Sequence, residues 1–311
     1  MIALWGLGSE RTLTAVREAL QRLGAPTRLI DQGDVLHTAV RLDIGARVRG
    51  SVRTRDHTID LEAITAVYLR PYDSRLLAAI AGSGPGDPAW QHALAVDDAV
   101  ASWSELTPAL VVNRLGAMAA NSSKPYQLQQ ISRLGFRVPE TLVTTDPRAA
   151  HAFWERHGAV VYKSVSGVRS RVSRLRRRDR ARLSDVASCP TQFQEFVDGR
   201  DHRVHVVDTD VFASRVVCDA DDYRYAGGRP VEIRPCALPL EVEDRCRRLA
   251  HAMSLPVAGI DLRQRRDGAW YCFEVNPSPA FVFYEEATSQ PIGDAVARFL
   301  TTGVRNPGTP R

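Results

Sequence analysis

The feature of this sequence that most constrains the fold is a predicted β-hairpin near the C-terminus. Two apolar stretches, 257–263 and 270–276, flank the pair Asp267-Gly268. Asp-Gly is favoured in two-residue type I′ turns because both central positions need a positive φ. Counting outward from such a turn places Asp261 directly opposite Glu274. The sequence therefore predicts two antiparallel strands that bring two carboxylates face to face.

These facing carboxylates predict a metal site. Directly opposed residues have Cβ atoms ~4.5 to 5.5 Å apart, and like charges at that spacing repel. Asn276 lies two residues beyond Glu274, so the two-residue period of a strand puts its amide on the same face. Oxygen ligands of this kind suit Mg²⁺, with Mn²⁺ as an alternative. The competing interpretation is a solvent-facing acidic pair neutralised by Arg263, and a longer turn would shift the register.

Length and composition are those of a folded protein with more than one lobe. The chain has 311 residues, of which 44% are hydrophobic, 25% charged and 7% aromatic, which excludes disordered, collagen-like and membrane classes. No apolar run approaches the ~20 residues that span a bilayer, and residues 1–8 lack a basic leader. We therefore expect a cytoplasmic protein without a membrane partner. The five cysteines show no zinc or redox spacing.

The predicted elements begin as a βαβ unit and end with antiparallel hairpins, which gives an α/β class with an α+β C-terminal part. A lobe boundary is expected near Asn113, and an earlier hairpin turns at 208–210. His202 and His205 are expected at the surface or in a groove. The main predicted ranges are strands 2–7, 27–30, 66–69 and 159–164, and helices 12–23, 89–103, 122–134, 147–157, 246–253 and 290–300.

The hairpin and two upstream segments together resemble the ATP-grasp enzymes, especially the RimK-type glutamate ligases and the graspetide macrocyclases. Residues 259–262 and 273–279, with the sequences GIDL and FEVNPSP, resemble the family's metal-binding motifs. Residues 161–167, VYKSVSG, resemble the strand lysine and the loop that closes over phosphates. Residues 194–203, QEFVDGRDHR, resemble the adenine hinge and the acidic residue that binds ribose.

A further element, Asp222-Tyr223-Arg224, is similar to the aspartate-aromatic-arginine element of the graspetide enzymes. The resemblance covers roughly residues 113–300. It implies an ATP-grasp fold with an N-terminal βαβ pre-ATP-grasp lobe at 1–113. A central lobe with the phosphate-covering loop would follow at 114–191, and a C-terminal antiparallel-sheet lobe with the magnesium site at 192–305.

The resemblance also implies ATP and Mg²⁺ as cofactors and assigns roles to individual residues. Catalytic roles fall to Arg224, Arg203 and Lys163. Phosphate contacts fall to Lys124, Lys163, Ser166 and Gly167, adenine contacts to Glu195, Phe196 and Val197, ribose to Asp201, and metal to Asp261, Glu274 and Asn276. The position of Lys163 supports this assignment, because it ends an apolar strand just before a serine and glycine loop. A plain strand-edge lysine is the alternative.

The implied function is an ATP-dependent carboxylate-amine or carboxylate-hydroxyl ligase that forms an acyl phosphate. A RimK-like ligase would act on an amino acid or a peptide. The alternative is a graspetide-type macrocyclase that forms side-chain lactones or lactams in an acidic precursor peptide. A second alternative is an ATP- or nucleic-acid-binding protein of the same fold without catalysis.

Positive charge is concentrated within the net charge of +5, because eight arginines fall between Arg169 and Arg182. Such a cluster attracts anions, although a solvated helix face is an equal alternative. Arg70, Arg169 and Arg171 are candidate substrate contacts. No aromatic residues interleave with the arginines to stack bases, so nucleic acid is not favoured as a partner. The oligomeric state is open, with a homodimer as the candidate.

Overall fold

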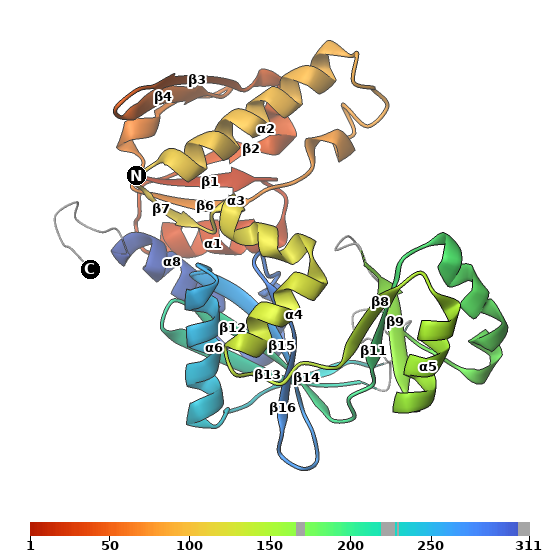
Figure 1. Cartoon of the computed structure of the whole chain (residues 1–311). Helices are drawn as coiled ribbons and strands as arrows, with labels where there is room; N and C mark the ends of the chain where they lie inside the picture. Colours follow the sequence, from red (N-terminus) through yellow and green to blue (C-terminus); the bar gives the residue numbers. More distant parts are fainter. Residues whose placement is uncertain (166–171, 219–227, 229, 304–311) are drawn as a thin grey trace.

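The computed structural model describes residues 1–165, 172–218, 228 and 230–303, without the side chains of residues 120 and 121. Within this part of the chain the strands form four sheets, grouped in three lobes (Figure 1). No helix there is long and apolar enough to cross a membrane.

The N-terminal lobe is built on a parallel sheet of order β2-β1-β6-β7, as the βαβ pattern predicts. Strand β1 is buried along its whole length. Helix α1 presents Leu13, Val16 and Leu20 to the core at helical spacing. Helix α2 starts at a cap in which Asp87 accepts from the Ala89 N–H at 2.7 Å. The bounds are β1 Ile2–Gly6, α1 Arg11–Arg22, β2 Thr27–Asp31, β6 Ala66–Arg70, α2 Pro88–Leu106 and β7 Leu110–Val112, with an outer antiparallel sheet of β3 Ala39–Ile44, β4 Val48–Arg53 and β5 Thr58–Asp60.

The central lobe is an antiparallel sheet of order β10-β9-β11-β8, covered on one side by helix α5 and the 3-10 segment η5 (Figure 1). Its strand β11 pairs with both β8 and β9. The expected boundary between 191 and 192 therefore cuts through this sheet, because β11 belongs here and not with the C-terminal lobe. The bounds are β8 Thr141–Thr144, α5 Pro147–His157, β9 Val160–Ser164, β10 Ser173–Arg174, η5 Arg177–Ser188 and β11 Thr191–Glu195.

The C-terminal lobe is an antiparallel sheet of order β14-β13-β12-β15-β16. Helix α4 packs on β16 of this sheet, although its residues were expected in the central lobe. Helix α8 packs on α1 and joins the C-terminal lobe to the N-terminal lobe. The bounds are α3 Leu115–Met118, α4 Lys124–Arg133, β12 Arg200–Val207, β13 Asp210–Val217, β14 Glu232–Pro235, α6 Leu240–Ala252, β15 Val257–Gln264, β16 Trp270–Asn276, α7 Val282–Thr288 and α8 Ile292–Thr302.

The turn between β15 and β16 is not the predicted two-residue type I′ turn. The Gly268 N–H donates to the Arg265 carbonyl at 3.0 Å, and the Arg265 N–H donates to the Ala269 carbonyl at 2.9 Å. Gly268 has a φ of +84°, whereas Asp267 keeps a negative φ. The loop is therefore one residue longer, as in a type I turn that ends in a left-handed glycine.

A β-bulge restores the predicted register further along the hairpin. Near the turn Leu262 pairs with Cys272, one position away from the expected register. An irregularity between Asp261 and Leu262 then shifts the pairing, so that Asp261 lies opposite Glu274. The facing carboxylates are thus confirmed, but through two one-residue shifts that cancel.

Two buried amide side chains fasten the ends of β15 and β16 to the preceding segments. Gln127 of α4 donates to the Val275 carbonyl at 2.7 Å and accepts from the Val275 N–H at 3.0 Å. Asn113 donates to the Val257 carbonyl at 2.6 Å and accepts from its N–H at 3.2 Å. Each amide satisfies backbone groups at a buried site, as a neighbouring strand would.

Replacing Gln127 with leucine should therefore destabilise the protein, because the buried N–H and carbonyl of Val275 would lose their partners. We expect a loss of about 2 to 4 kcal/mol in the free energy of unfolding, measured by urea denaturation. The matched control is Gln129→Leu on the exposed side of the same helix, which should change stability by less than about 0.5 kcal/mol. Equal effects of the two changes would show that the hydrogen bonds between Gln127 and Val275 do not stabilise the fold.

Candidate active site

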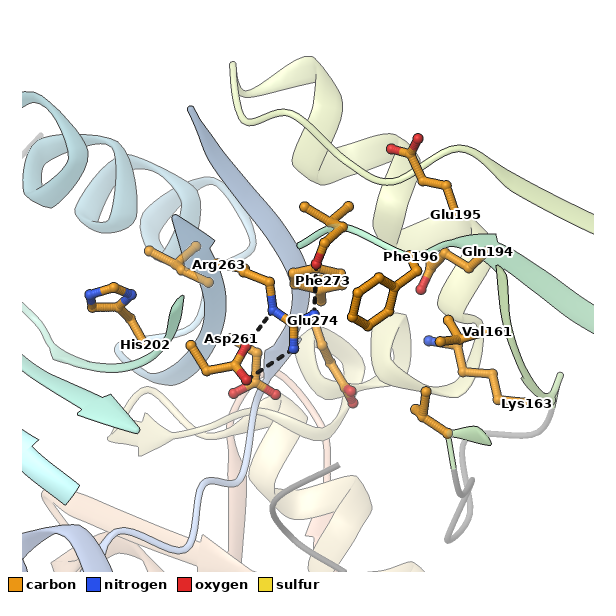
Figure 2. A pocket seen from close by; sticks show the side chains of 14 residues that line it. Val161, Lys163, Gln194, Glu195, Phe196, His202, Asp261, Arg263, Phe273 and Glu274 are labelled. Atoms are coloured by element: carbon orange, nitrogen blue, oxygen red, sulfur yellow. Dashed lines mark hydrogen bonds and ion pairs between the residues drawn. The ribbon is translucent and has the colours of Figure 1, made fainter. Parts of the chain in front are cut away.

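A cavity of about 100 Å³ lies between the central and C-terminal sheets. Figure 2 shows labelled side chains from β9, β11, β15 and β16 around this space. The predicted residues that line it are Lys163, Glu195, Phe196, Val197, Asp201, Asp261 and Glu274. Gln194, His202, Arg263 and Phe273, which had no predicted site role, also line it. The cavity thus gathers predicted residues that are more than a hundred positions apart in the chain.

One row of side chains across three strands carries the charges of the site. Arg203 of β12 pairs with Asp261 of β15, which pairs with Glu274 of β16. Arg203 Nη1 donates to Asp261 Oδ1 at 2.7 Å, and Lys124 Nζ lies 3.0 Å from Glu274 Oε1. Each carboxylate therefore has its own cation. The alternative in which Arg263 neutralises the pair is wrong, because Arg263 binds another carboxylate.

The acidic row fits a hard divalent cation. Glu274 and Asn276 both belong to β16 and are two residues apart. Asn276 Oδ1 accepts from the Ser278 N–H at 2.9 Å, so the second lone pair of this oxygen is left for a metal ion. Among the described residues no group of three or more His, Cys, Asp or Glu side chains is placed to hold a metal ion. Two carboxylates and one amide suit Mg²⁺, which keeps water and phosphate oxygens as further ligands.

Asp201 and Arg263 form a bidentate ion pair at one wall of the cavity. Arg263 Nε and Nη2 donate to Asp201 at 2.6 and 2.9 Å, and Arg263 Nη1 donates to the Val197 carbonyl at 2.8 Å. The Arg263 guanidinium also lies 5.3 Å from the Phe273 ring centre. These contacts fix the direction of the Asp201 carboxylate.

In the predicted adenine hinge, Glu195 to Val197, two backbone N–H groups are already hydrogen-bonded within the protein. The Glu195 N–H donates to the Glu140 carbonyl at 3.0 Å, and the Phe196 N–H donates to the Ala159 carbonyl at 2.9 Å. These two donors are engaged inside the fold. A nucleotide base would therefore have to use other groups of the hinge, such as the Val197 N–H.

One member of the arginine cluster belongs to this region of the site. The Arg174 guanidinium lies 4.3 Å from the centre of the Phe196 ring, within the range of a cation-π contact. Arg180 and Arg182 make contacts elsewhere on the central lobe, with His151 and Asp185 respectively. The described arginines therefore spread over more than one surface.

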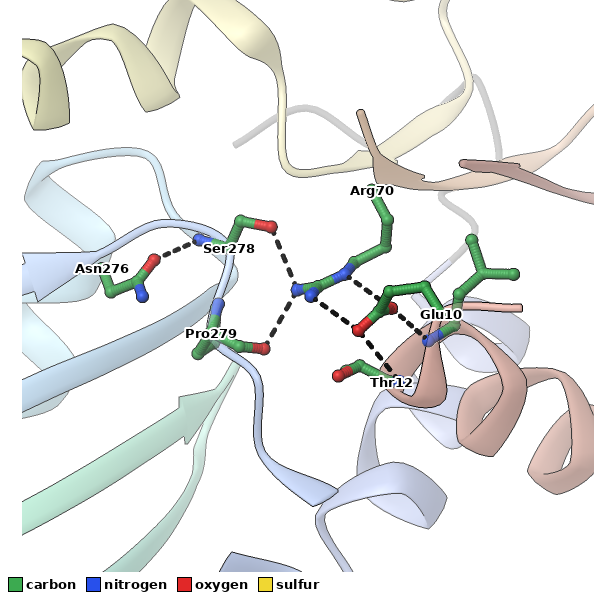
Figure 3. A network of polar contacts seen from close by, with 7 residues as sticks. Glu10, Thr12, Arg70, Asn276, Ser278 and Pro279 are labelled. Carbon is green, nitrogen blue, oxygen red and sulfur yellow. Dashed lines mark hydrogen bonds and ion pairs between the residues drawn. The ribbon is translucent and has the colours of Figure 1, made fainter. Parts of the chain in front are cut away.

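Arg70 takes part in a network between the N-terminal lobe and the loop after β16 (Figure 3), and it is not among the residues that line the cavity. Its Nη1 donates to Ser278 Oγ and to the Pro279 carbonyl, both at 3.0 Å, and its Nη2 lies 3.2 Å from Glu10 Oε1. Burial opposes ionisation of Glu10, but Arg70 and the N–H groups at the start of α1 outweigh it and hold the pKa of Glu10 below its usual value. Arg70 is thus a lobe-joining residue in this structure, and its donors are engaged within the protein.

Several predicted residues lie outside the described part of the chain: Ser166, Gly167, Arg169, Arg171 and Arg224. Sequence reasoning also missed partners such as Gln127 and Glu10. One signal was available and unused. Only two of the 41 lysine and arginine residues are lysines, Lys124 and Lys163. They are 9% and 8% exposed, and both lie at or beside the cavity.

Comparison with known families gives a match to the RimK-like ATP-grasp domain over residues 121–300. Beta-citrylglutamate synthase B of Danio rerio is 29% identical over 153 residues, covering 45% of this chain and 37% of that protein. A probable alpha-L-glutamate ligase of Syntrophotalea carbinolica is 29% identical over 205 residues, covering 61% of this chain and 66% of that protein. The chain thus spans less than two thirds of either relative.

Solved structures match over nearly the whole chain. The ATP-grasp ligase PsnB, complexed with a phosphomimetic variant of a minimal precursor, Mg and ADP, is 27% identical with a TM-score of 0.82 and covers 98% of each chain. The macrocyclase MdnC of Microcystis aeruginosa, bound with the precursor peptide MdnA, is 21% identical with a TM-score of 0.80. It covers 97% of this chain and 99% of its own. The expected fold is confirmed by these matches.

Because both lysines of this chain lie at or beside the cavity, we test whether an ammonium group is required at Lys163. Lys163→Arg should weaken the binding of Mg²⁺-ADP by at least about tenfold, because a guanidinium is bulkier than the compact ammonium that this buried position accommodates. Isothermal titration calorimetry would measure the change. Arg178→Lys, the reverse exchange at an exposed site, should leave the affinity unchanged. An arginine at 163 that binds Mg²⁺-ADP normally would show that the ammonium is not required.

Proposed function

Because the chain belongs to the RimK-like ATP-grasp family, we propose that it is an ATP-dependent ligase that activates a carboxylate as an acyl phosphate. The observation that carries this proposal is the row of Arg203, Asp261 and Glu274 at the edge of the cavity. Two opposed carboxylates, each paired with a cation from another element, form a site in which a metal ion can replace those cations. We place ATP in the adjoining cavity and the protein in the cytoplasm.

Each group in the proposed site has a physical role. Mg²⁺ at Asp261, Glu274 and Asn276 would neutralise charge on the phosphates. Lys124 and Lys163 would then contact phosphate oxygens as point charges. Asp201, held by Arg263, would accept hydrogen bonds from the ribose hydroxyls.

The proposed reaction has two steps. A substrate carboxylate oxygen attacks the γ-phosphorus, the bond to the β-phosphate oxygen breaks, and ADP leaves. An amine or hydroxyl then attacks the acyl carbon, its proton is released, and phosphate leaves with the original carboxylate oxygen. Arg203 is suited to stabilise the oxyanion that forms when the acyl carbon is attacked, because its guanidinium is already fixed at the carboxylate row. Arg224 is the second candidate for this role.

We favour a peptide as the substrate. The relative PsnB, which matches 98% of this chain at 25% identity, has been solved with the precursor peptide PsnA2 and AMPPNP. An acidic peptide would also suit the basic surface of the central lobe. The competing candidate is ligation of an amino acid, which the likeness to a probable alpha-L-glutamate ligase favours.

Mass spectrometry separates these two outcomes. The protein is incubated with Mg²⁺-ATP and an acidic peptide that also carries serine, threonine and lysine, with and without free glutamate. Cyclisation removes water from the peptide, whereas ligation adds a residue. We expect water loss coupled to the release of phosphate. Turnover of neither kind, despite tight binding of ATP, would favour a binding protein without catalysis.

The metal assignment predicts that Asp261→Asn and Glu274→Gln each lower kcat by about a hundredfold or more, because each removes one anionic ligand. Phosphate release at saturating ATP would measure the loss. Asp267→Asn, in the turn of the same hairpin, serves as the control and should keep normal turnover. Wild-type rates in either ligand variant would remove that residue from the proposed site.

The ribose assignment predicts that Asp201→Asn weakens Mg²⁺-ADP binding by about tenfold, since hydrogen bonds to a charged acceptor are among the stronger ones. Asp198→Asn is the matched control. Asp198 lies on the loop just before β12, in an exposed pair with Arg266, 3.7 Å away. If both variants bind ADP as the wild type does, Asp201 does not contact the nucleotide.

A further inference from the structure

The guanidinium of Arg203 lies against Gly259 of β15 in the C-terminal sheet. A Cβ atom added at residue 259 would come within 2.0 Å of Arg203 Nη2 and 2.8 Å of the Pro279 Cβ. Arg203 itself is 6% exposed. The missing side chain at 259 therefore provides the space into which the guanidinium folds across β15.

His205 holds the other end of the same guanidinium. It lies two residues beyond Arg203 on β12 and pairs with Gly259, so it occupies the next row on the same sheet face. Arg203 Nε donates to His205 Nε2 at 3.4 Å. The imidazole meets the Tyr284 ring edge-on, with 4.9 Å between the ring centres. Arg203 is thus held at Nε by a histidine and at Nη1 by Asp261.

The imidazole of His205 is suited to accept this hydrogen bond. It is 1% exposed, in contrast to the expected surface or groove position. Burial, and then the charge of Arg203, lower its pKa well below the usual value, so the ring is neutral. A neutral imidazole that accepts at Nε2 carries its proton on Nδ1, and Nδ1 is buried without a hydrogen-bond partner. An unsatisfied donor destabilises a core, so packing alone does not explain a histidine here.

The two anchors of Arg203 differ in what happens to them on metal binding. Asp261 can hold Arg203 only until a metal ion takes its carboxylate. His205 lies outside the predicted ligand set and keeps its position in the sheet. It can therefore still orient the guanidinium after Asp261 has changed partner.

We propose that His205 is a positioning residue, which accepts the Nε hydrogen of Arg203 and aims its guanidinium at the terminal phosphate of bound nucleotide. The inference rests on the proposed role of Arg203 in ATP-dependent ligation. It assigns a function to a residue that touches neither nucleotide nor metal. Gly259 leaves the space that the Arg203 guanidinium occupies, and His205 fixes the direction in which that guanidinium points.

The test compares two nucleotides that differ in the terminal phosphate. Calorimetry on the full chain gives the affinities of Mg²⁺-AMPPNP and Mg²⁺-ADP. His205→Phe keeps a ring against Tyr284 but has no acceptor, so it should weaken AMPPNP binding about five- to tenfold, the size of one charge-assisted hydrogen bond. Its ADP affinity should stay within about twofold of the wild type, because ADP lacks the phosphate that Arg203 faces.

Rescue distinguishes positioning from packing. His205→Gln can place its amide oxygen near the position of Nε2 and should restore the preference for AMPPNP. Normal AMPPNP binding by His205→Phe would overturn the inference. It would also be overturned if the phenylalanine and glutamine variants both lost affinity for AMPPNP and for ADP to the same extent. Should the phenylalanine variant fail to fold, His205→Leu replaces it with the same expected outcomes.

Arg203→Met separates the inference from the proposed function. It should lose the preference for AMPPNP at least as strongly as His205→Phe. A methionine variant that keeps the wild-type preference for AMPPNP would show that Arg203 does not contact the terminal phosphate. The role of His205 would then be wrong as well, but the proposal that the protein binds nucleotide would be unaffected. A wild-type protein that binds neither nucleotide would overturn the proposed function itself.

Discussion

The site depends on the alignment of β12, β15 and β16, which sets Arg203, Asp261 and Glu274 in one row. Like charges on adjacent strands repel, so the acidic pair needs a compensating cation. The fold supplies two, one from the sheet and one, Lys124, from α4. The sheet would be destabilised without them, and in the proposed reaction the same cations would contact phosphate oxygens once a metal had replaced them.

Burial decides how strong these charge pairs are. The side chains of Arg203 and Lys124 are 7% and 10% exposed, so solvent screens them less than it screens the many surface pairs. Removing one partner of such a pair leaves an uncompensated charge in a region of low dielectric. A metal-nucleotide complex brings positive and negative charge together, so it can take over both halves of each pair at once. The geometry therefore favours joint binding of metal and nucleotide.

Local patterns in the sequence predicted the elements well and their partners less well. Apolar periodicity located α1, β1 and the final helix within a few residues, because these depend on neighbouring positions. The facing of Asp261 and Glu274 came from counting that assumed a two-residue turn and no bulge. Neither leaves a clear mark in the sequence. His205 was misplaced because its surroundings come from segments far along the chain, and the partners of Arg70 were not predicted for the same reason.

The use of arginine in place of lysine almost everywhere has a practical consequence. Both side-chain amines of this protein lie at or beside the cavity. Reagents that acylate amines, including common fluorescent dyes and surface-coupling chemistries, would find side-chain targets only there. In the proposed site, a bound nucleotide would shield both lysines from such reagents. Immobilisation for binding studies would be better directed to the exposed thiol of Cys189.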